Sequence, residues 1–317
     1  MSKITSPVHS TLRSNSNLLS DNKQSPAVGY LISLQSKRSR QTMKSFLTIV
    51  AKILGYNTLL DCPWSSLRRQ HIQAILEKLL SEGRSPATVN TYLAGMKGVM
   101  LEAWTMKLID TESFQHIRQV KSVKGTRISR GRSLSTFEVQ QLFKLLANDH
   151  SAKGIRDAAI LAILLGCGLR RAELVALNYE DIEVARKILI VMGKGNKQRR
   201  SFMPDSSWLR LCTWIEDIRG EYSGPLFTRI RRFDDVTMNR LSDQAIYHIL
   251  QTRQQEAGIP PFAPHDLRRT FASMMLENGE DIVTVKDAMG HASISTTQRY
   301  DHRGDGRLVR ASQRIIF

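Results

Sequence analysis

Apolar residues recur every three or four positions through the first third of the chain, which is the period of an amphipathic α-helix. Within this region Ser85 stands directly before Pro86, a pair typical of the N-cap and the first position of a helix. We therefore predict a compact domain of four or five helices over residues 26–117. The repeating segments are residues 41–54, 64–83 and 85–104.

The pattern changes in residues 134–317. One helix is predicted to begin near Ser135 or Thr136, and a second, over residues 155–165, is almost wholly apolar. Three short stretches then have the character of β-strands, with a turn at residues 193–198. The predicted strands are residues 178–184, 186–192 and 199–203. Everything after residue 206 has a helical pattern, so this domain is predicted to be mostly α with a small three-stranded antiparallel sheet.

Two further segments lack a regular period. Residues 1–25 hold seven serines and few apolar side chains, so we expect a disordered leader. Residues 118–133 contain two glycines and no acidic residue, and we expect them to link the two domains. The basic residues of this linker are Arg118, Lys121, Lys124, Arg127, Arg130 and Arg132.

The charge balance is the least ordinary property of the composition. The 317 residues carry 46 Lys and Arg against 29 Asp and Glu, a formal net charge of +17 with a pI of about 10.1. Such an excess favours a polyanionic partner, most simply nucleic acid, with an anionic membrane surface as the weaker alternative. The basic linker is predicted to lie along DNA phosphates, whereas the alternative is a solvated tether.

Other classes of protein fit the sequence poorly. No stretch approaches the ~20 apolar residues that span a bilayer, and the N-terminus lacks the apolar region of a secretory signal. The three cysteines, Cys62, Cys167 and Cys212, are widely spaced and fit neither a disulfide framework nor a zinc site. We therefore expect a cytoplasmic protein with no membrane partner.

The candidate chemistry lies in the second domain, in residues suited to attack on a phosphodiester. His265 and Arg268 are three apart at a helix start, so they share a face, and we expect that face to point outward. The complete set is Arg170, Lys194, His265, Arg268, His291 and Tyr300.

Each of these residues has an ordinary structural explanation when it is taken alone. Arg170 can simply pair with Glu173 at the protein surface, and His291 can cap a helix. Lys194 can be a solvated turn residue, and Lys197 in the same turn competes with it for any chemical role. The order and spacing of the whole set carry more information than any member.

Four short motifs occur in that order. They are Gly-Leu-Arg-Arg-Ala-Glu-Leu at residues 168–174, Gly-Lys-Gly-Asn-Lys-Gln-Arg at 193–199, His-Asp-Leu-Arg-Arg-Thr-Phe-Ala at 265–272, and Met-Gly-His followed by Ser-Thr-Thr-Gln-Arg-Tyr at 289–300. With them the chain resembles the tyrosine recombinases, the family of phage integrases and Xer recombinases, from about residue 25 to the end. Two positions depart from the family pattern, since Cys167 replaces a threonine and Arg269 a second histidine.

The resemblance implies a helical DNA core-binding (SAM-like) domain followed by a catalytic domain. Tyr300 is then the nucleophile that forms a 3′-phosphotyrosyl bond. Lys194 protonates the 5′-hydroxyl leaving group, and His265 assists proton transfer. The groups implied to stabilise charge on the phosphoryl oxygens are Arg170, Arg268 and His291.

The same resemblance implies that Glu173 and Arg269 support the site, and that no metal or nucleotide cofactor is needed. Lys197 and Arg199 of the turn are expected to join the linker cations in contacting DNA. The expected partner is double-stranded DNA bearing recombination sites. A homotetramer would assemble on it through residues 306–317, which dock either on a neighbour or on their own protomer.

The implied function is site-specific cleavage and rejoining of DNA through a Holliday junction, for integration or excision of a mobile element. One alternative is Xer-type resolution of chromosome or plasmid dimers. Others are a catalytically idle DNA-binding accessory protein and a type IB topoisomerase or telomere resolvase. All of these place the protein in a bacterial cytoplasm, associated with the nucleoid.

Overall fold

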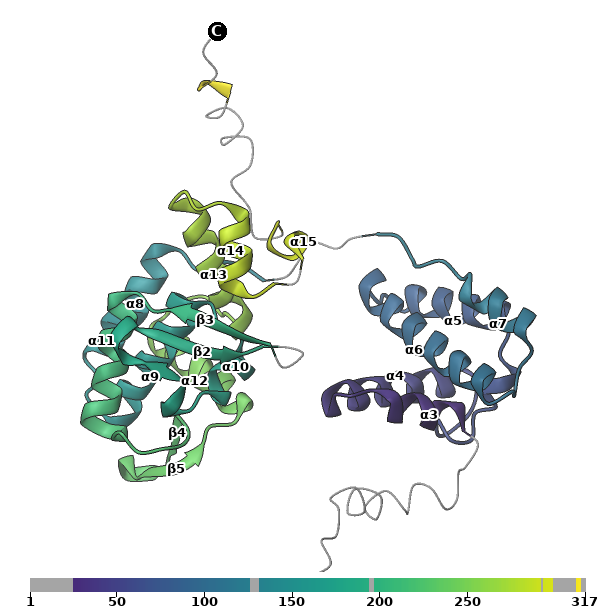
Figure 1. The fold of residues 1–317 in the computed structure, drawn as a ribbon, viewed down its shortest axis with the longest axis horizontal. Coiled ribbons are helices and arrows are strands. Elements are labelled where there is room, and N and C mark those ends of the chain that lie inside the picture. The colour runs from purple at the N-terminus through teal and green to yellow at the C-terminus, as the bar shows by residue number, and fades with distance from the viewer. Residues whose placement is uncertain (1–24, 126–130, 194–196, 292, 299–311, 315–317) are drawn as a thin grey trace, which may run out of the picture. The chain divides into compact units, whose positions relative to one another are not determined.

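The computed structural model of the protein describes residues 25–125, 131–193, 197–291, 293–298 and 312–314. The chain divides into two compact units, Met1–Ser129 and Arg130–Phe317 (Figure 1). Each unit has its own hydrophobic core. None of the described helices is long and apolar enough to cross a lipid bilayer.

The described part of the first unit is helical, as predicted. Its α-helices are α3 (Pro26–Ser33), α4 (Lys37–Ile53), α5 (Arg69–Ser81), α6 (Pro86–Thr105) and α7 (Thr111–Arg118). The longest, α6, packs against the other four. It begins as the sequence predicts: Pro86 takes the first helical position, and the Ser85 hydroxyl accepts a hydrogen bond from the Thr88 amide at 3.2 Å.

The chain after α7 stays on the first unit for several residues. The side-chain amide of Asn90 binds the backbone of Val123 twice, donating to its carbonyl at 3.0 Å and accepting from its N–H at 2.8 Å. Lys97 donates to the carbonyls of Arg118 and Val120 at 2.8 and 2.7 Å. The predicted linker therefore begins with a strap, residues 119–125, that is fastened to α6.

The second unit is built around α9 (Ala152–Cys167). This helix is buried on nearly every side, as its apolar sequence predicts. It packs against α8 (Thr136–Ala147), α10 (Arg171–Ala176), α11 (Asp205–Thr213) and α13 (Pro264–Glu277). The other described α-helices are α12 (Asp243–Glu256), α14 (Ile282–Met289) and α15 (Ile294–Gln298), and a π-helical turn, η4 (Trp214–Arg219), continues α11.

A three-stranded antiparallel sheet of order β1-β2-β3 confirms the predicted sheet (Figure 1). Its strands are β1 (Ile182–Glu183), β2 (Ile188–Met192) and β3 (Gln198–Phe202). Met192 pairs with Gln198, and the Gly193 amide donates to the Lys197 carbonyl at 2.8 Å. The turn between β2 and β3 therefore falls where the sequence predicts it.

The prediction that everything after residue 206 is helical is wrong for one segment. The strands β4 (Thr228–Ile230) and β5 (Val236–Arg240) form a separate antiparallel pair. In β4 only Thr228 and Ile230 are buried, with an exposed arginine between them. Three residues are too few for an alternating period to stand out from a helical one, so the sequence pattern does not reveal this pair.

The chain enters the second unit along α13. The amide of Arg132 donates to Asp266 at 3.1 Å, and that of Leu134 donates to the Thr270 hydroxyl at 2.8 Å. These bonds fix the end of the predicted linker to the helix that carries two of the candidate site residues. The helix is thereby held by the incoming chain as well as by α9.

Candidate active site

Arg170 lies where α9 gives way to α10. Gly168 ends α9 in the left-handed conformation, with φ of 58°, which glycine adopts without strain. The Arg170 amide then donates to the Glu173 carboxylate at 2.9 Å, and its guanidinium donates to the same carboxylate at 2.6 Å. The Arg170 side chain remains 40% exposed, whereas that of Glu173 is only 6% exposed. Arg170 is thus oriented by a buried acid and open to solvent.

Arg199 of β3 reaches the same carboxylate. Its two terminal nitrogens donate to the two Glu173 oxygens at 3.1 and 2.8 Å, and its side chain is 14% exposed. This bidentate bond places Arg199 beside Arg170 on the Glu173 carboxylate, and the expected contact of Arg199 with DNA stays a prediction. Burial raises the pKa of Glu173, but hydrogen bonds from Arg199 and Arg170 outweigh it, so the net pKa is lowered.

Arg268 is buried in the second unit, with a relative exposure of 1%. Its terminal nitrogens donate to the carbonyls of Gly168 and Met289. The expectation that its helix face points outward is therefore wrong for Arg268 and correct for His265, which is exposed. Gly168 lies two positions before Arg170, and Met289 lies two positions before His291. Arg268 therefore links the two segments that carry Arg170 and His291.

His291 follows the end of α14, where Gly290 takes a left-handed conformation with φ of 62°. The ring is buried, and its Nδ1 lies 2.9 Å from the hydroxyl of the fully buried Thr297. Desolvation lowers the pKa of His291 to about 4, and the nearby Arg268 and Arg170 guanidiniums add to this effect. His291 is therefore a neutral hydrogen-bonding group at neutral pH.

The pKa of His265 is lowered for the same reasons, first by desolvation of the ring and then by the Arg269 and Arg268 guanidiniums. His265 in turn lowers the pKa of His291, by less than Arg268 and Arg170 do. Two imidazoles and several arginines thus lie close together, and the buried Glu173 carboxylate holds two of these arginines, Arg170 and Arg199. This excess of positive charge is suited to an anionic ligand.

The remaining predicted site residues divide into three groups. Lys194 and Tyr300 lie outside the described residues, as do Arg127, Arg130 and most of residues 306–317. Lys197 is exposed at the end of the β2–β3 turn. Arg269 donates to the Gly131 carbonyl at 3.3 Å and lies 3.8 Å from Asp266, so it contacts the incoming chain.

The predicted DNA contacts of the linker also differ among themselves. Arg118, Lys121 and Lys124 are exposed on the first unit. Arg132 is instead engaged by the second unit, because its guanidinium donates to Glu138 at 2.9 Å and to the Pro260 carbonyl at 2.7 Å. Those bonds anchor the incoming chain to the second unit, and the expected contact of Arg132 with DNA phosphates stays a prediction.

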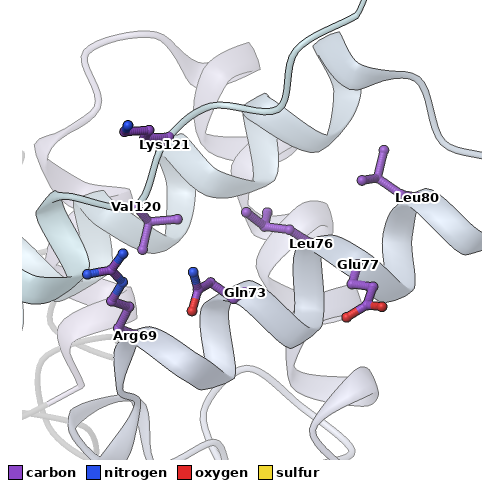
Figure 2. Close-up of a pocket in the computed structure, with 7 residues that line it drawn as sticks. All are labelled: Arg69, Gln73, Leu76, Glu77, Leu80, Val120 and Lys121. Carbon is purple, nitrogen blue, oxygen red and sulfur yellow. The ribbon is translucent and has the colours of Figure 1, made fainter.

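A hollow of about 430 Å³ lies beside the strap on the first unit (Figure 2). Leu76 and Val120 form part of its lining, while Arg69 and Lys121 come from α5 and the strap. Two cations from separate segments therefore border one concave surface. Arg69 did not stand out in the sequence because a charged residue on the exposed face of an amphipathic helix such as α5 is ordinary.

Two features of the site could not be found by sequence reasoning alone. One is Thr297, whose hydroxyl meets His291; its only signal is the Ser-Thr-Thr run before Tyr300. The other is the pairing of Arg199 with Glu173, which are 26 positions apart. In the described part of the chain, no group of three or more His, Cys, Asp and Glu could hold a metal ion.

Comparison with known proteins gives a consistent result. The model of the phage integrase family matches residues 132–307. Tyrosine recombinase XerD of Oceanobacillus iheyensis is 29% identical over 286 residues, covering 88% of this chain and 93% of the relative. Tyrosine recombinase XerD of Listeria innocua is 32% identical over 245 residues, covering 75% of this chain and 78% of the relative.

Among solved structures, the Tn1549 transposon integrase in complex with circular intermediate DNA has a similar fold. Its TM-score is 0.65 at 18% identity, covering 92% of this chain and 98% of that one. The family match spans the whole arginine and histidine cluster described above, from α8 to the region of Tyr300. The chain therefore belongs to the phage integrase family and is a tyrosine recombinase.

Proposed function

We propose that this chain cleaves and rejoins duplex DNA at specific sites through a 3′-phosphotyrosyl intermediate. The observation that carries the proposal is the cluster of Arg170, Arg268 and His291, in which the buried Glu173 orients Arg170 and both guanidiniums lie close enough to His291 to lower its pKa. The net charge of +17 supports a polyanionic substrate. The similar fold of an integrase solved with DNA adds to this support.

In the proposed reaction the Tyr300 oxygen attacks the scissile phosphorus and the bond from phosphorus to O5′ breaks. The phenolic proton passes to His265, whose depressed pKa leaves the ring neutral and able to accept it at neutral pH. Lys194 gives a proton to the departing O5′. The reverse step, with the 5′-hydroxyl of a partner duplex as nucleophile, restores the phosphodiester and exchanges the strands.

The negative charge that builds on the phosphoryl oxygens is stabilised by Arg170, Arg268 and His291. Arg170 offers a charged and exposed guanidinium, while His291 donates as a neutral ring. A bound phosphate raises the pKa of His291 from its value near 4, because the anion offsets the neighbouring guanidiniums. Donors fixed in advance stabilise the transition state without reorganising during the reaction.

The DNA contacts proposed outside this cluster are the exposed cations of the first unit and of the turn. Arg118, Lys121 and Lys124 follow one another along the end of α7 and the strap. Lys197 stands at the β2–β3 turn. Contacts of this kind neutralise phosphates and fix the register of the protein without reading base sequence.

The proposal extends to the biological role of the recombination reaction. We propose bacterial, nucleoid-associated recombination by four protomers on two DNA sites, with residues 306–317 joining neighbours. The sequence favours integration or excision of a mobile element, but the relatives are named XerC and XerD, which favours an Xer-type role instead. The DNA that flanks the gene distinguishes the two, since paired inverted repeats around a short spacer identify the site.

The experiment begins with duplex DNA selected from a random-sequence pool by binding to the Tyr300→Phe chain. Two plasmids that carry the selected site are incubated with wild-type protein, and recombinant products are counted. We expect recombinants with wild type and none with Tyr300→Phe. Relaxed plasmid without recombinants identifies a topoisomerase, and binding without cleavage identifies an idle accessory protein; either result overturns the proposal.

A further inference from the structure

The Glu173 carboxylate accepts four hydrogen bonds within the site. It accepts from the Arg170 amide, from the Arg170 guanidinium and from both terminal nitrogens of Arg199, all between 2.6 and 3.1 Å. A carboxylate offers about four lone-pair sites. Every one of these sites is used, and two of the four donors belong to Arg199, which the family resemblance left as a DNA contact.

The charges of these three side chains give Arg199 a definite effect. Two guanidiniums and one carboxylate sum to a net charge of +1. If Arg199 is removed, Arg170 becomes the sole ionic partner of a buried acid and the pair is neutral. An anion beside Arg170 is then next to a neutral Arg170–Glu173 pair. Because the setting is partly buried, the loss of net positive charge weakens the stabilisation of the anion.

Arg199 also touches the segment that carries His291. A Cβ placed on Gly290 would lie 2.9 Å from Arg199 Cδ and 3.1 Å from its Nε, so the arginine stem packs directly on the backbone of this glycine. The Arg199 side chain therefore spans from Glu173 to the turn before His291. A lysine cannot reproduce this arrangement, because one ammonium does not bridge both carboxylate oxygens in a plane.

We propose that Arg199 is a positioning residue of the recombinase site. It neutralises Glu173, so that the Arg170 guanidinium keeps its charge for the scissile phosphate, and it fixes the Gly290 turn that places His291. This inference rests on the proposed function, since the phosphate is the ligand that both positioned groups serve.

A double-mutant cycle separates this electrostatic role from simple packing. The duplex selected with Tyr300→Phe, nicked to trap the intermediate, is the probe, and the rate of covalent complex formation is measured at saturating protein. Arg199→Ala is expected to slow the reaction about 100-fold, the loss expected when a buried charged partner is left behind. Adding Glu173→Gln removes the acid that now cancels the charge of Arg170, and we expect it to recover about 10-fold of that loss.

Two further variants keep the proposal open to refutation. Arg199→Lys retains the charge and tests whether the planar bridge matters; we expect a rate about 10-fold below wild type. Arg200→Ala is the matched control, because Arg200 is the next residue of β3 and is exposed. We expect Arg200→Ala to react at a rate close to wild type under saturating conditions.

The outcomes are distinct. If Glu173→Gln restores nothing, or if Arg200→Ala loses as much as Arg199→Ala, Arg199 is not a positioning residue. If Arg199→Ala does not fold, Arg199→Lys and the double variant Arg199→Lys with Glu173→Gln are compared instead. They decide the same question, whether Arg199 positions the site. If wild-type protein forms no covalent complex with the selected duplex, the proposed function fails, which is a different result from a failure of Arg199 alone.

Discussion

Two arginine clusters of the second unit differ in how their charge is balanced. The core cluster consists of Arg156, Asp157 and Arg253, all at most 7% exposed, with Asp149 and Glu256 at its edge. Asp157 bridges both arginines, with donors at 2.7 to 3.0 Å. Two guanidiniums there meet three carboxylates.

The site cluster has the opposite balance. Arg170 and Arg199 share one carboxylate, that of Glu173, whereas Arg268 donates to the backbone carbonyls of Gly168 and Met289. The two clusters therefore contain the same types of residue. They differ in how many carboxylates pair with their arginines. Arginines whose charge is fully matched stabilise the fold, and those with charge left over can bind an anion.

The largest expected effect that tests this comparison comes from Arg170. Arg170→Ala should slow covalent complex formation about 10³-fold, as expected for the loss of one donor to a charged transition state. Its stability should change little, since the side chain is 40% exposed. Arg171→Ala is the matched control, because that neighbouring guanidinium is paired with Asp243 at 3.0 Å. Equal losses in the two variants would remove the distinction.

The core cluster should show the reverse behaviour. Asp157→Asn keeps the shape of the side chain but leaves two buried arginines without their shared acid, at a cost of roughly 3–5 kcal/mol in the free energy of unfolding. Urea denaturation at neutral pH measures this loss. Glu256→Gln is the control, since Glu256 is 43% exposed, and exposed ion pairs contribute about 1 kcal/mol or less. An Asp157→Asn chain that is stable but unable to cleave DNA would contradict the comparison.

A smaller effect concerns the pH dependence of stability. The pKa of His291 is about 4 in the folded chain against an ordinary value of 6.5. Between these values the unfolded chain binds a proton that the folded chain does not, so folding stability falls as the pH drops from about 6.5 to 4.

His291→Gln removes this component of the pH dependence. We expect wild type to lose roughly 1–3 kcal/mol more than the variant between pH 7 and pH 4. Urea denaturation of both proteins across this range measures the difference. Identical slopes would show that the burial of His291 and the neighbouring guanidiniums do not lower its pKa in the folded chain.

The smallest expected effect concerns the exposed cations of the strap, which belong to neither cluster. Lys121→Gln and Lys124→Gln should each reduce the slope of log K against log salt by about 1. The rate of cleavage at saturating protein should be unchanged. Lys52→Gln, an exposed lysine of α4, serves as the control. If the strap variants abolish cleavage instead, the chemistry is not confined to the second unit.

Much of this architecture follows from the sequence. The apolar repeats predict the helices of both units, and Ser85 and Ser135 mark two helix starts through their side-chain hydrogen bonds. The β2–β3 turn is predicted by its glycines. These features depend on neighbours within a few residues, which a linear pattern records.

The partners of the arginines could not be predicted in the same way. Arg253 meets Asp157 from 96 positions away, and Arg199 meets Glu173 from 26 positions away. Such pairs are fixed by the packing of whole helices and strands. Adjacent arginines in one motif can therefore pair with acids from different elements. Arg170 pairs with Glu173 three positions further on, whereas Arg171 pairs with Asp243, which is 72 positions away and could not be found from the local sequence.

The central claim is that the cationic cluster serves a phosphate attacked by Tyr300. Its most direct test is mass spectrometry of the protein after reaction with the nicked selected duplex and digestion of the DNA by nuclease. We predict that wild-type protein carries a nucleotide through a phosphodiester on Tyr300, and that Tyr300→Phe carries none. A nucleotide attached to another residue, or an adduct that persists in Tyr300→Phe, would contradict the account.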